Sequence, residues 1–66
     1  MEMNNEFFTR PRTIDEVAGF LGCTRRFVAS EIAAGRLRAR RLSARLIRIM
    51  PGDLRSWLDQ ASTLQS

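Results

Sequence analysis

Residues 13–35 read TIDEVAGFLGCTRRFVASEIAAG, and this stretch carries two helix signals separated by a short turn. Thr13 and Glu16 match the capping box, in which each side chain binds the other residue's backbone amide. Apolar residues follow at helical spacing, at positions 14, 17, 18 and 21. Gly22 suits the left-handed conformation that ends many helices. The pattern therefore predicts a helix over 14–21.

A second helix is predicted over 25–34, directly after the turn. Thr24 is a good N-cap residue, and Gly35 supplies the stop. Two short helices joined by a tight, glycine-containing turn are typical of a helix-turn-helix. At 100 degrees per residue, Val28 and Ile32 lie on the inward face of this helix. The outward face then carries Arg26, Ser30 and Ala33, with Arg25, Phe27 and Ala29 at its flanks.

The chain beyond Gly35 predicts a hairpin and a third helix. Residues 37–40 (LRAR) and 47–49 (IRI) alternate apolar and basic, which is the period of half-buried strands, and residues 41–46 form the turn between them. No Asn-Gly or similar pair fixes the register. Pro51 favours a helix start, and apolar residues at 54, 57, 58 and 61 predict a helix over 51–61 whose largest core side chain is Trp57.

The expected fold is mainly α with a small β-hairpin, in the order helix, turn, helix, two-stranded wing, helix. We expect an N-terminal arm over residues 1–12, one domain over 13–61 and a C-terminal tail over 62–66. Phe20 falls off the main face of the first helix. Phe7 and Phe8 in the arm either cover it or meet a neighbouring subunit, and we favour packing within the chain.

The composition excludes most catalytic templates. The chain has 66 residues, no histidine, no tyrosine and one cysteine, Cys23. These counts leave no internal disulfide, no Cys/His zinc site and no Ser-His or Cys-His pair. We therefore expect no enzyme activity, no metal and no cofactor. The N-terminal sequence lacks the pattern of a signal peptide and no segment is long and apolar enough for a membrane span, so we expect a cytoplasmic protein.

The positive charge is concentrated in one segment. All 11 basic residues are arginine, and the formal net charge is +4. Residues 25–48 hold eight arginines and one acid, Glu31, for a net charge of +7. Such asymmetry indicates a nucleic-acid partner or, less often, an anionic membrane surface. The preference for arginine over lysine favours bidentate contacts to phosphates and guanine edges, and a GC-rich genome explains it equally well.

The run TIDEVAGFLGCTRRFVASEIAAGRLRARRLSARLIRIMPGDLRSWL, from Thr13 to Leu58, resembles the small winged helix-turn-helix family of phage excisionases and AlpA-type regulators, relatives of the MerR DNA-binding domain. The resemblance implies a DNA-binding protein. For an excisionase it further implies cooperative binding to tandem sites, DNA bending, and an integrase steered toward excision in a bacterial host cell. The matching pieces are Glu16-Val17-Ala18, Leu21-Gly22, Thr24-Arg25-Arg26, Val28, Gly35-Arg36-Leu37, Ile49, Asp53-Leu54 and Trp57-Leu58.

The expected partners are double-stranded DNA, an integrase or recombinase, and further copies of the chain on DNA, with no membrane. Two alternatives stay open: a small AlpA/MerR-like transcriptional regulator, and a basic membrane-surface or protein-interaction module. Residues at three places are expected to contact DNA. These are Thr24, Arg25, Arg26, Ala29 and Ser30 on the second (recognition) helix; Arg40, Arg41, Arg45 and Arg48 on the wing; and Arg12 and Thr13 as possible phosphate contacts.

Overall fold

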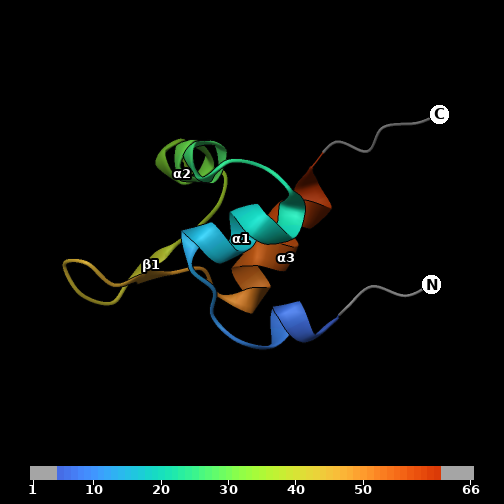
Figure 1. The fold of residues 1–66 in the computed structure, drawn as a ribbon, viewed down its shortest axis with the longest axis horizontal. Coiled ribbons are helices and arrows are strands. Elements are labelled where there is room, and N and C mark those ends of the chain that lie inside the picture. Colours follow the sequence, from blue (N-terminus) through green and yellow to red (C-terminus); the bar gives the residue numbers. More distant parts are fainter. Residues whose placement is uncertain (1–4, 62–66) are drawn as a thin grey trace.

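The computed structural model describes residues 5–61, and this part of the chain folds into three α-helices and a two-stranded antiparallel hairpin (Figure 1). This small, mostly helical arrangement is consistent with a helix-turn-helix followed by a wing. The elements in chain order are η1 (Asn5–Thr9), α1 (Ile14–Leu21), α2 (Arg25–Ala33), β1 (Arg40–Arg41), β2 (Ile47–Arg48) and α3 (Pro51–Gln60).

The predicted capping box of α1 is confirmed. The Glu16 amide donates to Thr13 Oγ1 at 3.0 Å, and the Thr13 amide donates to Glu16 Oε1 at 2.9 Å. These bonds satisfy two of the amides that a helix start leaves without partners. At the other end Gly22 adopts φ 72°, and the next amide, that of Cys23, donates to Ala18 O at 3.0 Å. The helix therefore has the predicted bounds, 14–21.

The second helix is one residue shorter than predicted. Thr24 Oγ1 accepts from the Phe27 amide at 3.0 Å, as expected of an N-cap. At the other end, Ala34 is the cap and Gly35 has φ 82°. The Gly35 amide donates to Ile32 O, three residues back, so the last turn is tighter than an α-turn. The chain then leaves the helix toward the hairpin.

The hairpin is shorter than the predicted alternation. Its pairs are Arg40 with Arg48 and Arg41 with Ile47, in antiparallel register. Residues 37–39, which were predicted to be part of the first strand, lie outside it. Leu37 is instead a core side chain with 1% exposure. Burial of this leucine holds the chain against the helices, so strand pairing begins only where the backbone has moved away from them.

A small core joins the helices to the chain on either side of the hairpin. Trp57, expected as the largest core side chain, is only half-buried and packs against the edge of this cluster, so that expectation is wrong. Leu54, one turn earlier on α3, has no exposed surface and fills the position instead. The buried residues are Val17, Ala18, Val28, Leu37, Ile49 and Leu54.

The N-terminal segment belongs to the folded domain, contrary to the expectation of an arm. Residues 5–9 form η1, which packs against α3, and Arg12 pairs with Ile49 through two backbone bonds of 2.9 and 2.8 Å. Phe7 stacks on Phe20 with ring centroids 4.0 Å apart. The packing of the arm aromatics within the chain is thus confirmed. Residues 1–4 of the arm and the whole predicted tail, 62–66, lie outside the described residues.

Within residues 5–61, no helix has both the length and the apolar character that crossing a bilayer requires.

The left-handed turn at Gly22 predicts opposite effects for two glycine substitutions, one just after α1 and one within it. Gly22→Ala should destabilise the protein by about 1 kcal/mol, because a Cβ is disfavoured at positive φ. Gly19→Ala should stabilise it by about 0.5–1 kcal/mol, since Gly19 lies inside α1 and a Cβ there meets nothing within 4 Å. Urea unfolding followed by circular dichroism measures both. Equal effects of the two substitutions would contradict the assigned helix end.

Candidate nucleic-acid interface

The outward face of α2 carries the residues that the helical period predicted. Arg26 and Ser30 are exposed and Ala29 is half-buried, whereas Val28 has no exposed surface. Ser30 Oγ donates to Phe27 O at 2.9 Å, so its lone pairs face solvent. Among the described residues, the Arg26 side chain has no ion-pair or hydrogen-bond partner. A short polar group and a free guanidinium are therefore presented on one side of the helix.

Arg25, at the start of α2, is paired with α1. Its Nε lies 3.0 Å from Asp15 Oδ1, and both side chains are well exposed, at 63% and 73%. An ion pair this exposed is weak, because water screens the attraction and two long side chains lose freedom. Arg25 can therefore exchange Asp15 for a stronger anion such as a phosphate. The neighbouring Thr24 hydroxyl accepts the Phe27 amide and keeps its own proton to donate.

The hairpin places two arginines directly opposite each other. Arg40 and Arg48 are register partners, and like charges in that position repel. Arg40 Nε lies 3.5 Å from Asp53 Oδ2 of α3, which compensates one of the two charges. Arg48 is half-buried, and its Nη1 donates to Ile47 O at 2.9 Å. Arg40 and Arg48 therefore leave a net positive charge on the hairpin, and a bound anion would reduce the repulsion between them.

Arg41 and Arg45 lie near the tip of the hairpin and are exposed. Arg41 Nη1 donates to Ala44 O at 3.1 Å, which braces the turn. Neither side chain has a carboxylate partner among the described residues. Within residues 25–48, three arginines are paired with acids, namely Arg25, Arg36 and Arg40. The other five, Arg26, Arg38, Arg41, Arg45 and Arg48, make no such pair with the residues that the structure describes.

A hollow of about 230 Å³ brings several of these side chains together. It lies where the start of α1, the start of α2 and the hairpin meet, and Arg25, Arg45 and Arg48 supply three cations from two elements. Because the N-terminal end of a helix carries partial positive charge, α1 adds to the positive potential there. Thr13, Ile14, Asp15 and Ile47 complete the lining. The geometry suits an anion held between the helices and the hairpin.

Arg12 does not fit the phosphate contact predicted for it. Its side chain is only 11% exposed. Its Nε donates to Phe7 O and its Nη2 to Glu6 O, both at 3.0 Å, and its guanidinium lies 4.3 Å from the centre of the Phe7 ring. A weaker contact of 3.7 Å joins it to Glu16. Arg12 therefore fastens η1 to the start of α1, and only Thr13 of this predicted pair lines the hollow.

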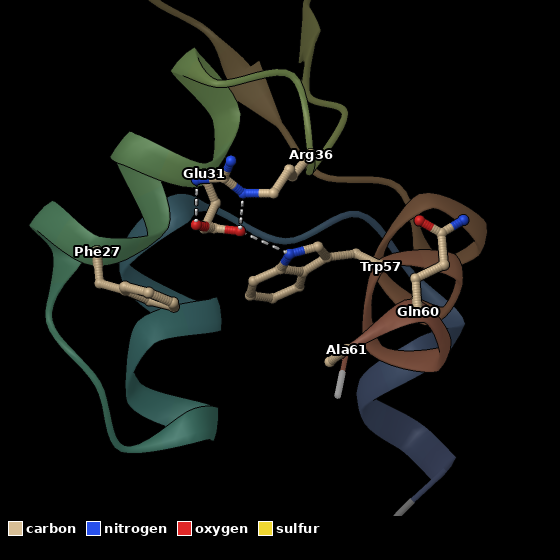
Figure 2. Close-up of a pocket in the computed structure, with 6 residues that line it drawn as sticks. All are labelled: Phe27, Glu31, Arg36, Trp57, Gln60 and Ala61. Atoms are coloured by element: carbon tan, nitrogen blue, oxygen red, sulfur yellow. Dashed lines mark hydrogen bonds and ion pairs between the residues drawn. The ribbon is translucent and has the colours of Figure 1, made fainter. Parts of the chain in front are cut away.

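Glu31 is the residue that the sequence reasoning missed. Figure 2 shows its carboxylate between Arg36 and Trp57, which come from the chain after α2 and from α3. Arg36 Nε and Nη2 donate to it at 3.0 and 2.9 Å, and Trp57 Nε1 donates at 3.2 Å. The hydrogen bonds from Arg36 hold the pKa of Glu31 below its usual value of 4.5, and that from Trp57 acts in the same direction. The feature of the sequence that could have identified Glu31 is its position as the single acid among the eight arginines of residues 25–48.

These contacts separate Arg36 from the hollow that Arg25, Arg45 and Arg48 line. Arg36 and Glu31 line a different hollow, of about 320 Å³, together with Phe27, Trp57, Gln60 and Ala61 (Figure 2). The carboxylate holds Arg36 against α2 and links α2 to α3 through the indole. Glu31 thus neutralises one arginine and fixes the helix that presents Arg26.

Of the positions predicted on α2 and on the hairpin, Arg25, Arg45 and Arg48 line one hollow, whereas Arg40 lines another beside the start of α3. Figure 1 shows α2 and the hairpin projecting from the same end, with the hairpin extending away from the helices.

Among the described residues, no group of three or more histidine, cysteine, aspartate or glutamate side chains is placed to hold a metal ion. No model of a known protein family matches the chain, and no curated protein is significantly similar to it.

The lowered pKa of Glu31 predicts how stability depends on pH. A folded-state pKa below the unfolded value gives stability that is present above the unfolded pKa and is lost as the pH falls through the folded one. Glu31→Gln should therefore lower the melting temperature at pH 7. On acidification to pH 3, the melting temperature of this variant should fall less than that of the wild type. Thermal unfolding followed by circular dichroism checks this. Asp59→Asn, on the exposed surface of α3, is the matched control and should melt like the wild type at pH 7.

Proposed function

We propose that this chain is a sequence-specific DNA-binding protein of the winged helix-turn-helix type, with α2 in the major groove and the hairpin as the wing. The observation that carries the proposal is the set of cations around the hollow between α1, α2 and the hairpin. Arg25 of α2 and Arg45 and Arg48 of the hairpin line this hollow. Arg26 lies outside it, exposed on α2, and like Arg45 and Arg48 has no carboxylate partner among residues 5–61. Phosphates along a duplex are the anions that such an extended array fits.

The small side chains on α2 support its place in the groove. The major groove admits an α-helix, and short side chains on the helix let its backbone approach the bases closely. Ala29 and Ser30 meet that condition, and Arg26 lies on the same outward face with a guanidinium that can bind guanine O6 and N7. Arg25, held weakly by Asp15, serves a flanking phosphate. The hairpin arginines contact the adjacent minor groove or its backbone.

The finer role that we propose is that of a phage excisionase, a recombination directionality factor with no catalytic step of its own. It acts in the cytoplasm of a bacterial host. The resemblance of residues 13–58 to that family supports this assignment. A module of this size reads few base pairs, so adequate specificity requires several copies on repeated sites. Side-by-side binding would bend the DNA and direct an integrase toward excision.

The decisive experiment is a footprint on a candidate phage attachment site, followed by an excision assay with the matching integrase. We expect protection of repeated sites and excision that depends on the protein. Protection without any effect on excision would assign the chain to the small transcriptional regulators instead. Flotation with anionic vesicles, together with no protection of DNA, would overturn DNA binding altogether.

Two arginine substitutions should separate base reading from phosphate binding. The wild-type binding constant should fall with salt with a log-log slope of about −4 to −6, from roughly five to seven neutralised phosphates. Arg26→Ala should weaken binding to the preferred site by about 1–3 kcal/mol and relax the sequence preference. Arg45→Ala should weaken binding to all sequences alike and reduce the slope by about 1.

Fluorescence anisotropy titrations at several salt concentrations measure both effects. Arg55→Gln removes the same charge from α3, where the guanidinium lies 4.3 Å from the Phe8 ring centre, and is the matched control. It should change the slope little. A slope near zero for the wild type on its preferred duplex would contradict the mechanism.

A further inference from the structure

The hairpin carries an exposed apolar pair that the phosphate contacts do not explain. Leu42 and Leu46 are 61% and 39% exposed, and Leu42 is the most exposed large apolar side chain among the described residues. The Leu42 amide donates to Leu46 O at 2.7 Å, which continues the pairing of Arg40 with Arg48 by two steps. The two leucines are therefore cross-strand neighbours at the end of the hairpin.

The register places this pair beside arginines. Side chains two apart on a strand share a face, and register partners share it too. One face of the hairpin thus carries the pair Arg40 and Arg48 near its base and the leucine pair toward its tip. Such a face combines an apolar end with two cations behind it. Isolated exposed leucines are ordinary, but these two occupy cross-strand positions at the end of a cationic hairpin. Leu42 also lines a shallow hollow with Arg40 and Met50 and still keeps 61% of its surface exposed.

The tip is held in shape by its own hydrogen bonds. The Ser43 amide donates to Leu46 O at 3.4 Å, the Leu46 amide donates to Ser43 O at 3.3 Å, and Arg41 reaches across to Ala44 O. These bonds close the turn between the two leucines. A turn fixed in this way presents the leucines without further ordering, so little conformational entropy is lost when they are buried in a partner.

We propose that Leu42 and Leu46 form a wedge that enters the minor groove and partly unstacks one base step, which kinks the duplex locally. This inference rests on the DNA binding proposed above. An apolar side chain gains by leaving water, and in the minor groove apolar side chains do so by inserting between stacked bases. Arg41 and Arg45 are next to the two leucines in the sequence and are exposed, so the hairpin end carries positive charge that attracts it to the phosphates.

The charges favour a duplex over a lipid surface as the occupant. An element that inserts into lipid carries a broad apolar face with large side chains. Here the apolar edge is two leucines wide, and the exposed face of α2 offers Arg26 and Ser30 instead of large apolar side chains. A narrow edge between arginines matches a groove with phosphates along both walls. The kink would act in each copy, in addition to any bend produced by neighbouring copies.

The test uses the full chain and a duplex that the wild type enriches from a randomised pool. The fluorescent base 2-aminopurine is placed at successive steps of that duplex, since its emission rises on unstacking, and end-labelled duplexes report the bend by energy transfer. We expect wild-type binding to raise the emission at one step and to shorten the end-to-end distance. Leu42→Ala/Leu46→Ala should abolish the emission change, reduce the shortening and leave the salt slope of binding unaltered.

Leu21→Ala is the matched control, because Leu21 is a 36% exposed leucine at the end of α1, outside the hairpin. It should unstack and bend the duplex like the wild type. Circular dichroism reports whether the double variant folds. If it does not, Leu42→Ala alone serves as the test, because it changes only one well-exposed side chain. It should reduce the emission change by at least half.

Two results would overturn the wedge while leaving DNA binding intact: wild-type binding without unstacking, or an unstacking signal that survives both alanine variants. Loss of binding to phosphatidylserine vesicles in the double variant, with the duplex still unstacked, would assign the leucines to a lipid surface. If the wild type enriches no duplex from the pool, the proposed function fails, and the wedge fails with it.

Discussion

The complete burial of Val28 is the constraint on which the proposed interface depends. A helix packed through one side chain at its middle has its rotation about its own axis fixed, because each neighbouring residue then lies at a set angle to the core. With Val28 inside, Arg26 and Ser30 can lie only outside, and Glu31 comes to lie toward α3. The Thr24 cap and the left-handed Gly35 limit the helix to a length that Val28, with the half-buried Ile32, can hold.

The acidic residues decide which arginines stay available. Glu31 and Asp53 are both half-buried, and each holds one arginine of the basic segment against the body of the protein. Asp15 holds another only loosely, at the surface. A positively charged face therefore results from selective neutralisation as much as from the number of arginines. The same charges repel one another in the free protein, which lowers its stability and leaves more to be gained from an anionic partner.

Local signals explain why the helices could be predicted so closely. The Thr13–Glu16 box, the Thr24 cap and the two left-handed glycines act over a few residues, so the sequence contains everything they need. The hairpin was less predictable, because burial of Leu37 in the core, a tertiary effect, competes with strand pairing. The sequence did not predict the register of its strands, which the structure shows by the pairing of Arg40 with Arg48.

The role of the N-terminal segment and that of Glu31 depend on contacts between distant parts of the chain. Nothing near Arg12 in the sequence indicates that Ile49 will pair with it or that the Phe7 ring will lie under its guanidinium. Likewise, the indole that binds Glu31 is 26 residues away. Exposure of the α2 face followed from the helical period alone. The division of the arginines between internal pairs and the open surface did not.

The hydrogen bond between the Trp57 indole and the Glu31 carboxylate also gives the protein an intrinsic optical probe. The chain has one tryptophan, so its ultraviolet emission comes from a single, known place. That place is the junction of α2 and α3, next to the half-exposed Phe27 ring. Any event that draws α2 away from α3 breaks this bond, rehydrates the indole and moves its emission to longer wavelength, without a label attached to the protein.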